Sequence, residues 1–420
     1  MTARIEPVRC LGSPLERAYW AFVMAIHPIC RRLRYSLAAT LMLLPVALHA
    51  QSTGGRTQQP ITVPPNLAAA MAQYHRALEE YVRAHAVYAA AASAYWSSIS
   101  EKRHLRAGKR ANHEQILLTD YVLDQPPVYT GPPKPRDPSK PEEEQAHEVY
   151  VPVVADFLAA AEREFKFVPR LPHSEGEFKR AYAATAQTAG LTKDQIVRIY
   201  SFEATGNGAY DVEAGLEYGR RGRAITTALG YNQLLATNSV EIIAEKGRQF
   251  ISDLTARAAQ SADDARRGLV GKIAILGKMV DVATSVPDDW NRHEALANTQ
   301  RGLGMHAMNL DLDVGPLLQT QKLLDSVVFA RRKGVEGTLT AAELEMMNLT
   351  GDGNGFDMIM LPPAWRQKVP TSNFFQRSGY GDNPVAQRNN VVARLIAATE
   401  ARMDQEMNKP GAKELAAALR

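Results

Sequence analysis

Residues 199–235 read IYSFEATGNGAYDVEAGLEYGRRGRAITTALGYNQLL, and they separate two groups of expected helices. Thr192 begins a capping box, which predicts a helix running from there toward Glu203. The next five residues, ATGNG, end that helix. Because Glu203 lies four residues after Ile199 and seven after Ile196, it shares the apolar face of the helix. The stretch therefore predicts a carboxyl at a helix end, beside an open loop.

The position of Glu203 suggests acid chemistry. A carboxyl on an apolar face loses hydration, which disfavours its charged form and raises its pKa. A general acid needs a raised pKa to hold its proton near neutral pH. The alternative is a solvated glutamate that ends a helix and has no chemical role.

On both sides of this stretch the apolar periodicity is helical. Ser174 and Thr340 begin two further capping boxes, and Gly190 ends the helix that starts at Ser174. Apolar spacing predicts further helices over residues 237–258, 262–284, 316–332 and 390–407. Strand signals are almost absent, so the expected fold is all-α, with a helical domain over residues 149–407 and a C-terminal tail over 408–420.

A long helical arm is expected before this domain, over residues 66–124. Tyrosines recur every seven residues on one stripe, at Tyr74, Tyr81, Tyr88 and Tyr95. A seven-residue stripe indicates packing against another helix, or self-association through residues 66–99. His85 falls in this stripe and is read as a packing histidine. Residues 125–148, rich in proline at their start, are expected to form an extended linker or strap.

A cationic cluster follows the stripe, at Lys102, Arg103, His104, Arg106, Lys109 and Arg110. It could bind an anionic wall polymer or lipid head groups, or it could be a solvated helix face. The cluster lacks the interleaved aromatic residues of a nucleic-acid site. Net charge gives no further support, since residues 1–50 hold six arginines and two acids and the rest of the chain is balanced. No nucleic-acid partner is expected.

The N-terminal residues resemble a secretory signal. Arg31, Arg32 and Arg34 precede the apolar run SLAATLMLLPVAL, and Ala50 supplies a small residue for cleavage. Residues 1–50 are expected to be this signal, with Met24 as the preferred start, and residues 51–65 to be a flexible tether. A membrane anchor is the alternative, although the run is short for one. Both cysteines fall in the leader, so the expected mature protein is periplasmic or secreted and has no disulfide.

The order of motifs resembles the lysozyme-like superfamily, in particular lytic transglycosylases and goose-type lysozymes. In that family a helix ends in a catalytic glutamate, usually followed by serine, and a Gly-Leu-Met-Gln motif comes later. This chain has Glu203-Ala204, and then Gly-Tyr-Asn-Gln-Leu-Leu over residues 230–235. The resemblance covers about residues 170–260. It departs at Ala204, at Tyr231-Asn232 and in the longer stretch between the motifs.

The resemblance implies a cofactor-free enzyme that cleaves peptidoglycan or a related amino-sugar glycan. Glu203 would protonate the glycosidic oxygen, and Tyr231, Asn232 and Gln233 would contact the sugars. The family's aromatic–Asn motif has two approximate counterparts here, residues 373–375 and residues 380–383, which include Tyr380. Tyr380 would then bind substrate, or its loop would simply cap the last helix.

Alternatives to a transglycosylase remain open. An inverting hydrolase needs a second carboxylate roughly 6.5–9.5 Å from the acid. Asp211 could supply it, with Glu213 and Glu217 as weaker candidates, or Asp211 could be a solvated loop residue. A third alternative is a non-catalytic wall-binding or assembly protein that keeps a lysozyme-like shape. No metal site is expected, because residues 352–357, DGNGFD, depart from a calcium-binding loop and read better as a helix-ending turn.

Overall fold

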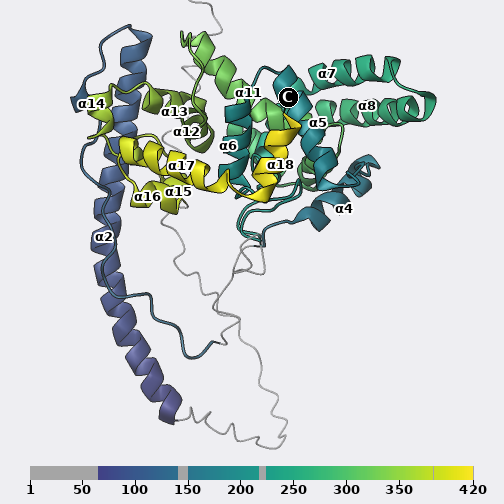
Figure 1. The fold of residues 1–420 in the computed structure, drawn as a ribbon. Coiled ribbons are helices and arrows are strands. Elements are labelled where there is room, and N and C mark those ends of the chain that lie inside the picture. The colour runs from purple at the N-terminus through teal and green to yellow at the C-terminus, as the bar shows by residue number, and fades with distance from the viewer. Residues whose placement is uncertain (1–64, 141–149, 217–223, 382, 420) are drawn as a thin grey trace, which may run out of the picture. The chain divides into compact units, whose positions relative to one another are not determined.

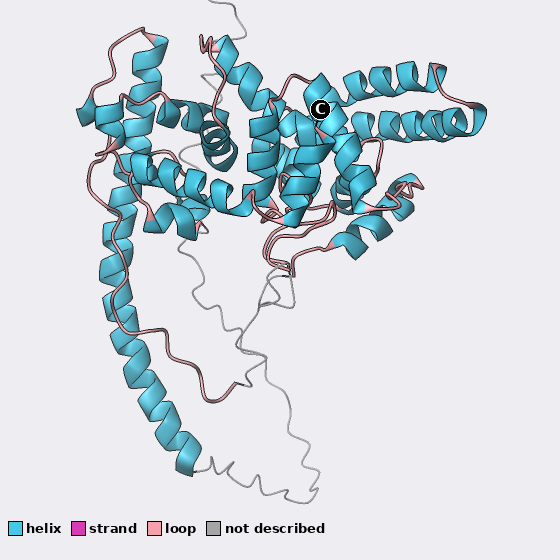
Figure 2. Cartoon of the chain, viewed as in Figure 1, coloured by secondary structure: helices cyan, strands magenta, loops and turns pink. Residues whose placement is uncertain are grey.

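The structure, a computed structural model, describes residues 65–140, 150–216, 224–381 and 383–419. The expected signal and nearly all of the expected tether lie outside these residues, and so does Glu217. Helices dominate the described chain (Figures 1 and 2), and strand pairing within it is limited to two isolated bridges, Glu213 with Leu229 and Leu229 with Leu234. The expected all-α fold is confirmed. None of the described helices is both long enough and apolar enough to cross a bilayer.

The first part of the expected arm is one continuous helix, α2, over Pro65–Ala111. Residues 112–124 of the expected arm are not part of it and hold only a 3₁₀ turn at Leu118–Asp120. Its tyrosine stripe packs against the extended proline-rich strap, which runs back along α2 (Figure 1). The Tyr129 ring of the strap lies 6.1 Å from Tyr81, 5.6 Å from His85 and 5.4 Å from Tyr88, measured between ring centroids. The expected helical partner is therefore replaced by the strap over this part of the stripe. Self-association of α2 stays a prediction.

The cationic cluster fastens α2 to the rest of the chain. The Arg106 side chain is 1% exposed; its Nη1 donates to the Asp120 carbonyl, and its guanidinium lies 4.3 Å from the Tyr121 ring centroid. Lys109 pairs with Asp120 at 2.7 Å, and Arg110 pairs with Asp357 at 2.6 Å. The cluster is mostly consumed by these internal contacts, so neither a free anion-binding patch nor a solvated helix face describes it. This corrects both readings of the sequence.

The remaining helices form one body. They are α4 (Val154–Phe165), α5 (Glu175–Thr188), α6 (Lys193–Glu203), α7 (Ala236–Ala259), α8 (Asp263–Ala283), α9 (Trp290–Ala297), α10 (Gln300–His306), α11 (Gly315–Arg332), α12 (Ala341–Thr350), α13 (Asp352–Ile359), α14 (Pro363–Arg366), α15 (Arg377–Gly381), α16 (Pro384–Arg388), α17 (Val392–Glu406) and α18 (Pro410–Ala418), with single 3₁₀ turns at Leu118–Asp120, Ala307–Leu310 and Thr371–Asn373.

Two hydrophobic clusters hold the body together. One is built by α4, α7, α8 and α10, and α7 lies beside α8 as a helical hairpin (Figure 1). The other is built mainly by α5, α6, α12, α17 and α18. Helix α11 contributes Leu318 to the first cluster and Leu323 to the second. Because both clusters share α11, side chains from α6, α7, α11 and α12 can meet beside it.

Most expected helices agree with the structure to within about two residues, including α7, α8, α11 and α17. Two expectations were wrong. The expected C-terminal tail is helix α18, whose Ala412 and Leu415 are buried. The stretch DGNGFD does not end a helix: Gly351, with φ +81°, separates α12 from α13, and Asp352 begins α13.

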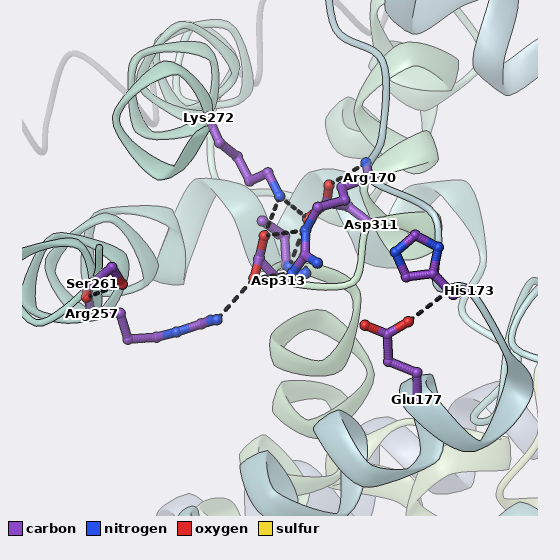
Figure 3. A network of polar contacts seen from close by, with 9 residues as sticks. Arg170, His173, Glu177, Arg257, Ser261, Lys272, Asp311 and Asp313 are labelled. Atoms are coloured by element: carbon purple, nitrogen blue, oxygen red, sulfur yellow. Dashed lines mark hydrogen bonds and ion pairs between the residues drawn. The ribbon is translucent and has the colours of Figure 1, made fainter. Parts of the chain in front are cut away.

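A buried ion network fixes the turn between α10 and α11 (Figure 3). Lys272 Nζ lies 2.6 Å from Asp311 Oδ1 and 2.5 Å from Asp313 Oδ2, and Arg170 and Arg257 both reach Asp313 Oδ1. Burial acts to raise the pKa of Asp313, but Arg170 and Lys272 hold it well below its usual range. The aspartates that the sequence places near His306 therefore form ion pairs that join α8, α7 and the segment before α5.

Candidate functional site

Glu203 is the last residue of α6, as the sequence predicts. Thr192 caps the start of α6 with both hydrogen bonds of a capping box, and the chain leaves the helix through Thr205 and Gly206, both with positive φ. The Glu203 side chain is partly buried, and Asn348 Nδ2 donates to its Oε1 at 2.6 Å. Burial raises the pKa of Glu203 above its ordinary value, against the lowering effects of Lys322, Glu345 and Asn348.

A second carboxyl, Glu345 of α12, lies beside Glu203. Glu345 is completely buried. Burial, together with the negative charge of Glu203, raises its pKa well above the usual glutamate range. Glu345 is hydrogen-bonded to Glu203, an arrangement that lowers the pKa of Glu203 and raises that of Glu345. Two adjacent carboxyls in a poorly hydrated site do not both ionise readily, so the pair shares one proton.

Lys322 of α11 supplies the positive charge facing this pair. Burial lowers the pKa of Lys322, and the charges of Glu203 and Glu345 raise it in opposition. Its Nζ also donates to the carbonyl oxygens of Asn232 at 3.3 Å and Gln233 at 3.4 Å. The two motifs singled out in the sequence thus both act on one lysine, the first through the charge of its carboxyl and the second through main-chain carbonyl oxygens.

A cavity of about 310 Å³ lies near this group, although neither Glu203 nor Glu345 is among its lining residues. Lys322 and Asn348 line it, so the two side chains that act on Glu203 are also part of the cavity wall. Trp290, at the start of α9, lines it as well and is 43% exposed. The volume lies at the lower end of the range for small-ligand pockets. An exposed indole beside polar groups gives such a cavity a flat face on which a ring can stack.

Three carboxylates line the same cavity: Glu241 of α7, Asp325 of α11 and Asp352 of α13. An adjoining cavity of about 230 Å³ shares these three residues. Asp352 accepts a hydrogen bond from Ser326 Oγ at 2.5 Å, and Asp325 lies 3.5 Å from Lys246 Nζ. Burial raises the pKa of Glu241 to about 7, and the neighbouring negative charges, Glu245 foremost, add to the effect.

The structure does not place Asp211 beside Glu203. Asp211 is exposed, and its charge acts on Glu175, Tyr210 and Glu213, whereas the charged groups acting on Glu203 are Lys322, Glu345 and Arg402. Glu213 is tied to the start of α4, since its Oε1 accepts from the Val154 N–H at 2.7 Å. The carboxyl that accompanies Glu203 is Glu345, on a helix far away in sequence.

Tyr231 and Asn232 correct the sugar-binding expectation. Both are completely buried. The Tyr231 ring lies 4.8 Å from Tyr200 and its hydroxyl bonds to Glu175, while Asn232 Nδ2 donates to Tyr182 Oη at 2.9 Å. These side chains therefore form core contacts and present no face to a sugar.

Gln233 and Tyr380 are likewise engaged inside the protein. The Gln233 amide donates to the carbonyls of Val212 and Gly230, so it shapes its own loop. Tyr380 is 7% exposed and packs against Trp96 of α2, with 5.6 Å between ring centroids. Tyr380 belongs to α15 and packs on the arm, so neither expected role, substrate contact or a loop that caps the last helix, describes it.

The residues of the site that were not singled out in the sequence include Glu345, Lys322, Glu241 and Trp290, and also Asp325 and Asn348. The first three carry a recognisable signal, because each is an ionisable residue inside an apolar helical run, as in LEMM, QKLL and VEII. Such residues are almost never buried unless paired. The sequence does not indicate which of them share a pocket, since their helices lie far apart along the chain. Among the described residues, no group of three or more His, Cys, Asp or Glu could hold a metal ion.

Comparison with known proteins adds no relative: no protein-family model, curated protein or solved structure matches this chain.

Proposed function

We propose that this chain is an exported enzyme that cleaves a glycosidic bond of an amino-sugar glycan such as peptidoglycan, with Glu203 as the acid. One observation carries the proposal: a carboxyl of raised pKa accepts a hydrogen bond from Asn348 and is acted on by the charge of Lys322, and these two residues line a cavity with an exposed tryptophan. The resemblance of the Glu203 and Gly230 motifs to lytic transglycosylases supports the same reading.

The chemistry requires one proton and one site that can take it back. Glu203 donates the proton to the glycosidic oxygen as the bond from that oxygen to the sugar C1 breaks. In the transglycosylase outcome, the C6 hydroxyl of the same sugar forms the new bond to C1 and returns its proton to Glu203. Glu345 and Lys322 set how readily Glu203 gives and regains that proton. Asn348 has to release the carboxyl when the substrate oxygen arrives at hydrogen-bond distance.

The rival function is glycan binding without cleavage. It is favoured by the internal engagement of Tyr231, Asn232 and Gln233, which leaves the second motif without a side chain in the cavity. In this case the cavity and Trp290 would hold a sugar, and Glu203 would have a structural role only.

Release of muropeptides from purified sacculi tests the proposal. Glu203→Gln keeps the shape and the Asn348 contact but removes the transferable proton, so release should stop while the unfolding midpoint stays near that of the wild type. Asp211→Asn is the matched control and should leave release unchanged. Mass spectrometry of the products separates anhydro sugars from reducing ends. Equal release by wild type and Glu203→Gln would overturn the proposal, and binding of sacculi without any release would favour the rival.

A further inference from the structure

The cavity of the proposed function has a net negative lining. Glu241, Asp325 and Asp352 line it against one ammonium, Lys322, which already faces the Glu203–Glu345 pair. The charged groups that act on Glu241 or line the two adjoining cavities come from α7, α11, α13 and the segment before α9; they are Glu245, Lys246, Asp288, Lys322, Asp325, Arg332 and Asp352. Acids outnumber bases in this set, even before Glu241 is counted.

The carboxylates of this lining repel one another, and the pKa values of two of them reflect it. The four carboxylates that act on Glu241 all raise its pKa, and the ones that act on Asp352 raise its pKa as well. Like charges held together in a partly desolvated pocket focus a field that attracts a cation. An anionic ligand meets the opposite field. A neutral ligand gains nothing from it.

Amino sugars, in either their neutral acetylated form or their cationic free-amine form, fit the other features of the cavity. An amino sugar offers a ring face for Trp290, and its nitrogen is either acetylated and neutral or free and protonated. Asn348 in the cavity wall also has a buried acceptor, Oδ1, without a hydrogen-bond partner among the described residues. A free ammonium complements the carboxylates of the lining, whereas an acetamide complements them poorly.

We infer that the cavity selects amino sugars with a free, protonated amine over their N-acetylated counterparts. This inference rests on the proposed function for the site, and it adds the charge of the preferred substrate. The preferred glycan is therefore one that has been partly de-N-acetylated. The lactyl and peptide carboxylates of ordinary muropeptides have to point out of the cavity.

Binding to the full chain carrying Glu203→Gln tests the inference without interference from cleavage. Glucosamine tetramers and N-acetylglucosamine tetramers are titrated near pH 7 by calorimetry at low and high salt. We expect the free-amine tetramer to bind more tightly, and its advantage to shrink with salt because the field is screened.

Variants identify the residues responsible. Asp352→Asn and Asp325→Asn should each weaken free-amine binding by roughly two- to fivefold, the range of a part-exposed charge pair, and leave the acetylated tetramer unaffected. Asp264→Asn, whose side chain is 92% exposed on α8, is the matched control and should change neither. The two substitutions are made in separate variants, so a folding defect in one leaves the other as a test.

The outcomes separate this inference from the proposed function. Equal affinities, tighter binding of the acetylated tetramer, or binding of neither overturns the charge preference. If wild-type protein nevertheless releases muropeptides, the proposed function stands alone. If the free-amine tetramer is preferred but wild type cleaves neither oligomer nor sacculi, the charge preference stands and the proposed enzymatic function fails.

Discussion

His306 predicts a loss of stability in acid that can be worked out from its contacts. The side chain is completely buried. Its Nε2 donates to the Thr227 carbonyl at 2.8 Å, which leaves Nδ1 as the acceptor for Ser239 Oγ at 2.8 Å. Asn309 Nδ2 also points at Nδ1, at 3.2 Å. A second proton on Nδ1 would meet that donor in a dry site, so burial lowers the pKa of His306 to about 4.

The magnitude follows from the difference between the folded and unfolded pKa values. In the unfolded chain His306 takes up a proton near pH 6.5, whereas in the folded chain it does so only near pH 4. Above pH 6.5 neither state binds the proton, and stability is complete. As the pH falls from 6.5 to 4 the unfolded state alone gains it, so stability declines. At about 1.4 kcal/mol per pH unit, the total loss is about 3 kcal/mol.

Urea unfolding of wild type and His306→Gln from about pH 7.5 to about pH 4 measures this loss. The variant loses packing at every pH, but the pH-dependent part should be smaller than in wild type by about 3 kcal/mol. His173→Gln, at an exposed position, is the control and should keep the wild-type slope. Equal slopes for wild type and His306→Gln would refute the reasoning, because His306 would then be protonated in both states alike.

Three substitutions test the corrected roles of other residues. Tyr231→Ala should lower the free energy of unfolding by about 3–5 kcal/mol, as for a buried aromatic residue. The control Tyr150→Ala, at a position 70% exposed, should lower it by less than about 1 kcal/mol. A stable Tyr231→Ala protein with weak glycan binding would restore the sugar-contact role. Lys272→Met leaves Asp311 and Asp313 without their buried cation and should lower the free energy of unfolding, measured with denaturant, by about 3–5 kcal/mol. The control Lys278→Met, at an exposed position of the same helix, should change it by no more than about 0.5 kcal/mol. Arg106→Met should loosen α2 and speed its limited proteolysis without changing the helices of the body; an unchanged cleavage rate would show that the arm is held elsewhere.

The helices could be predicted because their signals are local. The capping boxes at Thr192 and Thr340 and the apolar spacing of α7 and α8 act within a few residues, and the structure reproduces them. The end of α6 at Glu203 is likewise encoded by the residues that follow it. Secondary structure and the burial of one carboxyl were therefore within reach of the sequence.

The composition of the site depends on tertiary packing and was out of reach. Glu345 lies 142 positions after Glu203, and only the packing of α12 on α6 brings the two carboxyls together. Asp211 was favoured as the partner because it is near in sequence, but its loop faces Glu175. Tyr231 was expected to contact sugars because its motif resembles that of lytic transglycosylases, and a short motif does not show whether its side chains line a groove or fill a core.

The protonation state of Glu203 in the folded protein tests the central claim most directly. Full-length protein with ¹³C-labelled glutamate side chains is titrated by NMR, and the Glu203 carboxyl signal is assigned by its loss in Glu203→Gln. The account predicts that this carboxyl titrates above the ordinary glutamate pKa of 4.5, and that the pH at which it does so shifts when Glu345 is replaced by glutamine. Titration of Glu203 at or below 4.5, indifferent to Glu345, would contradict the account.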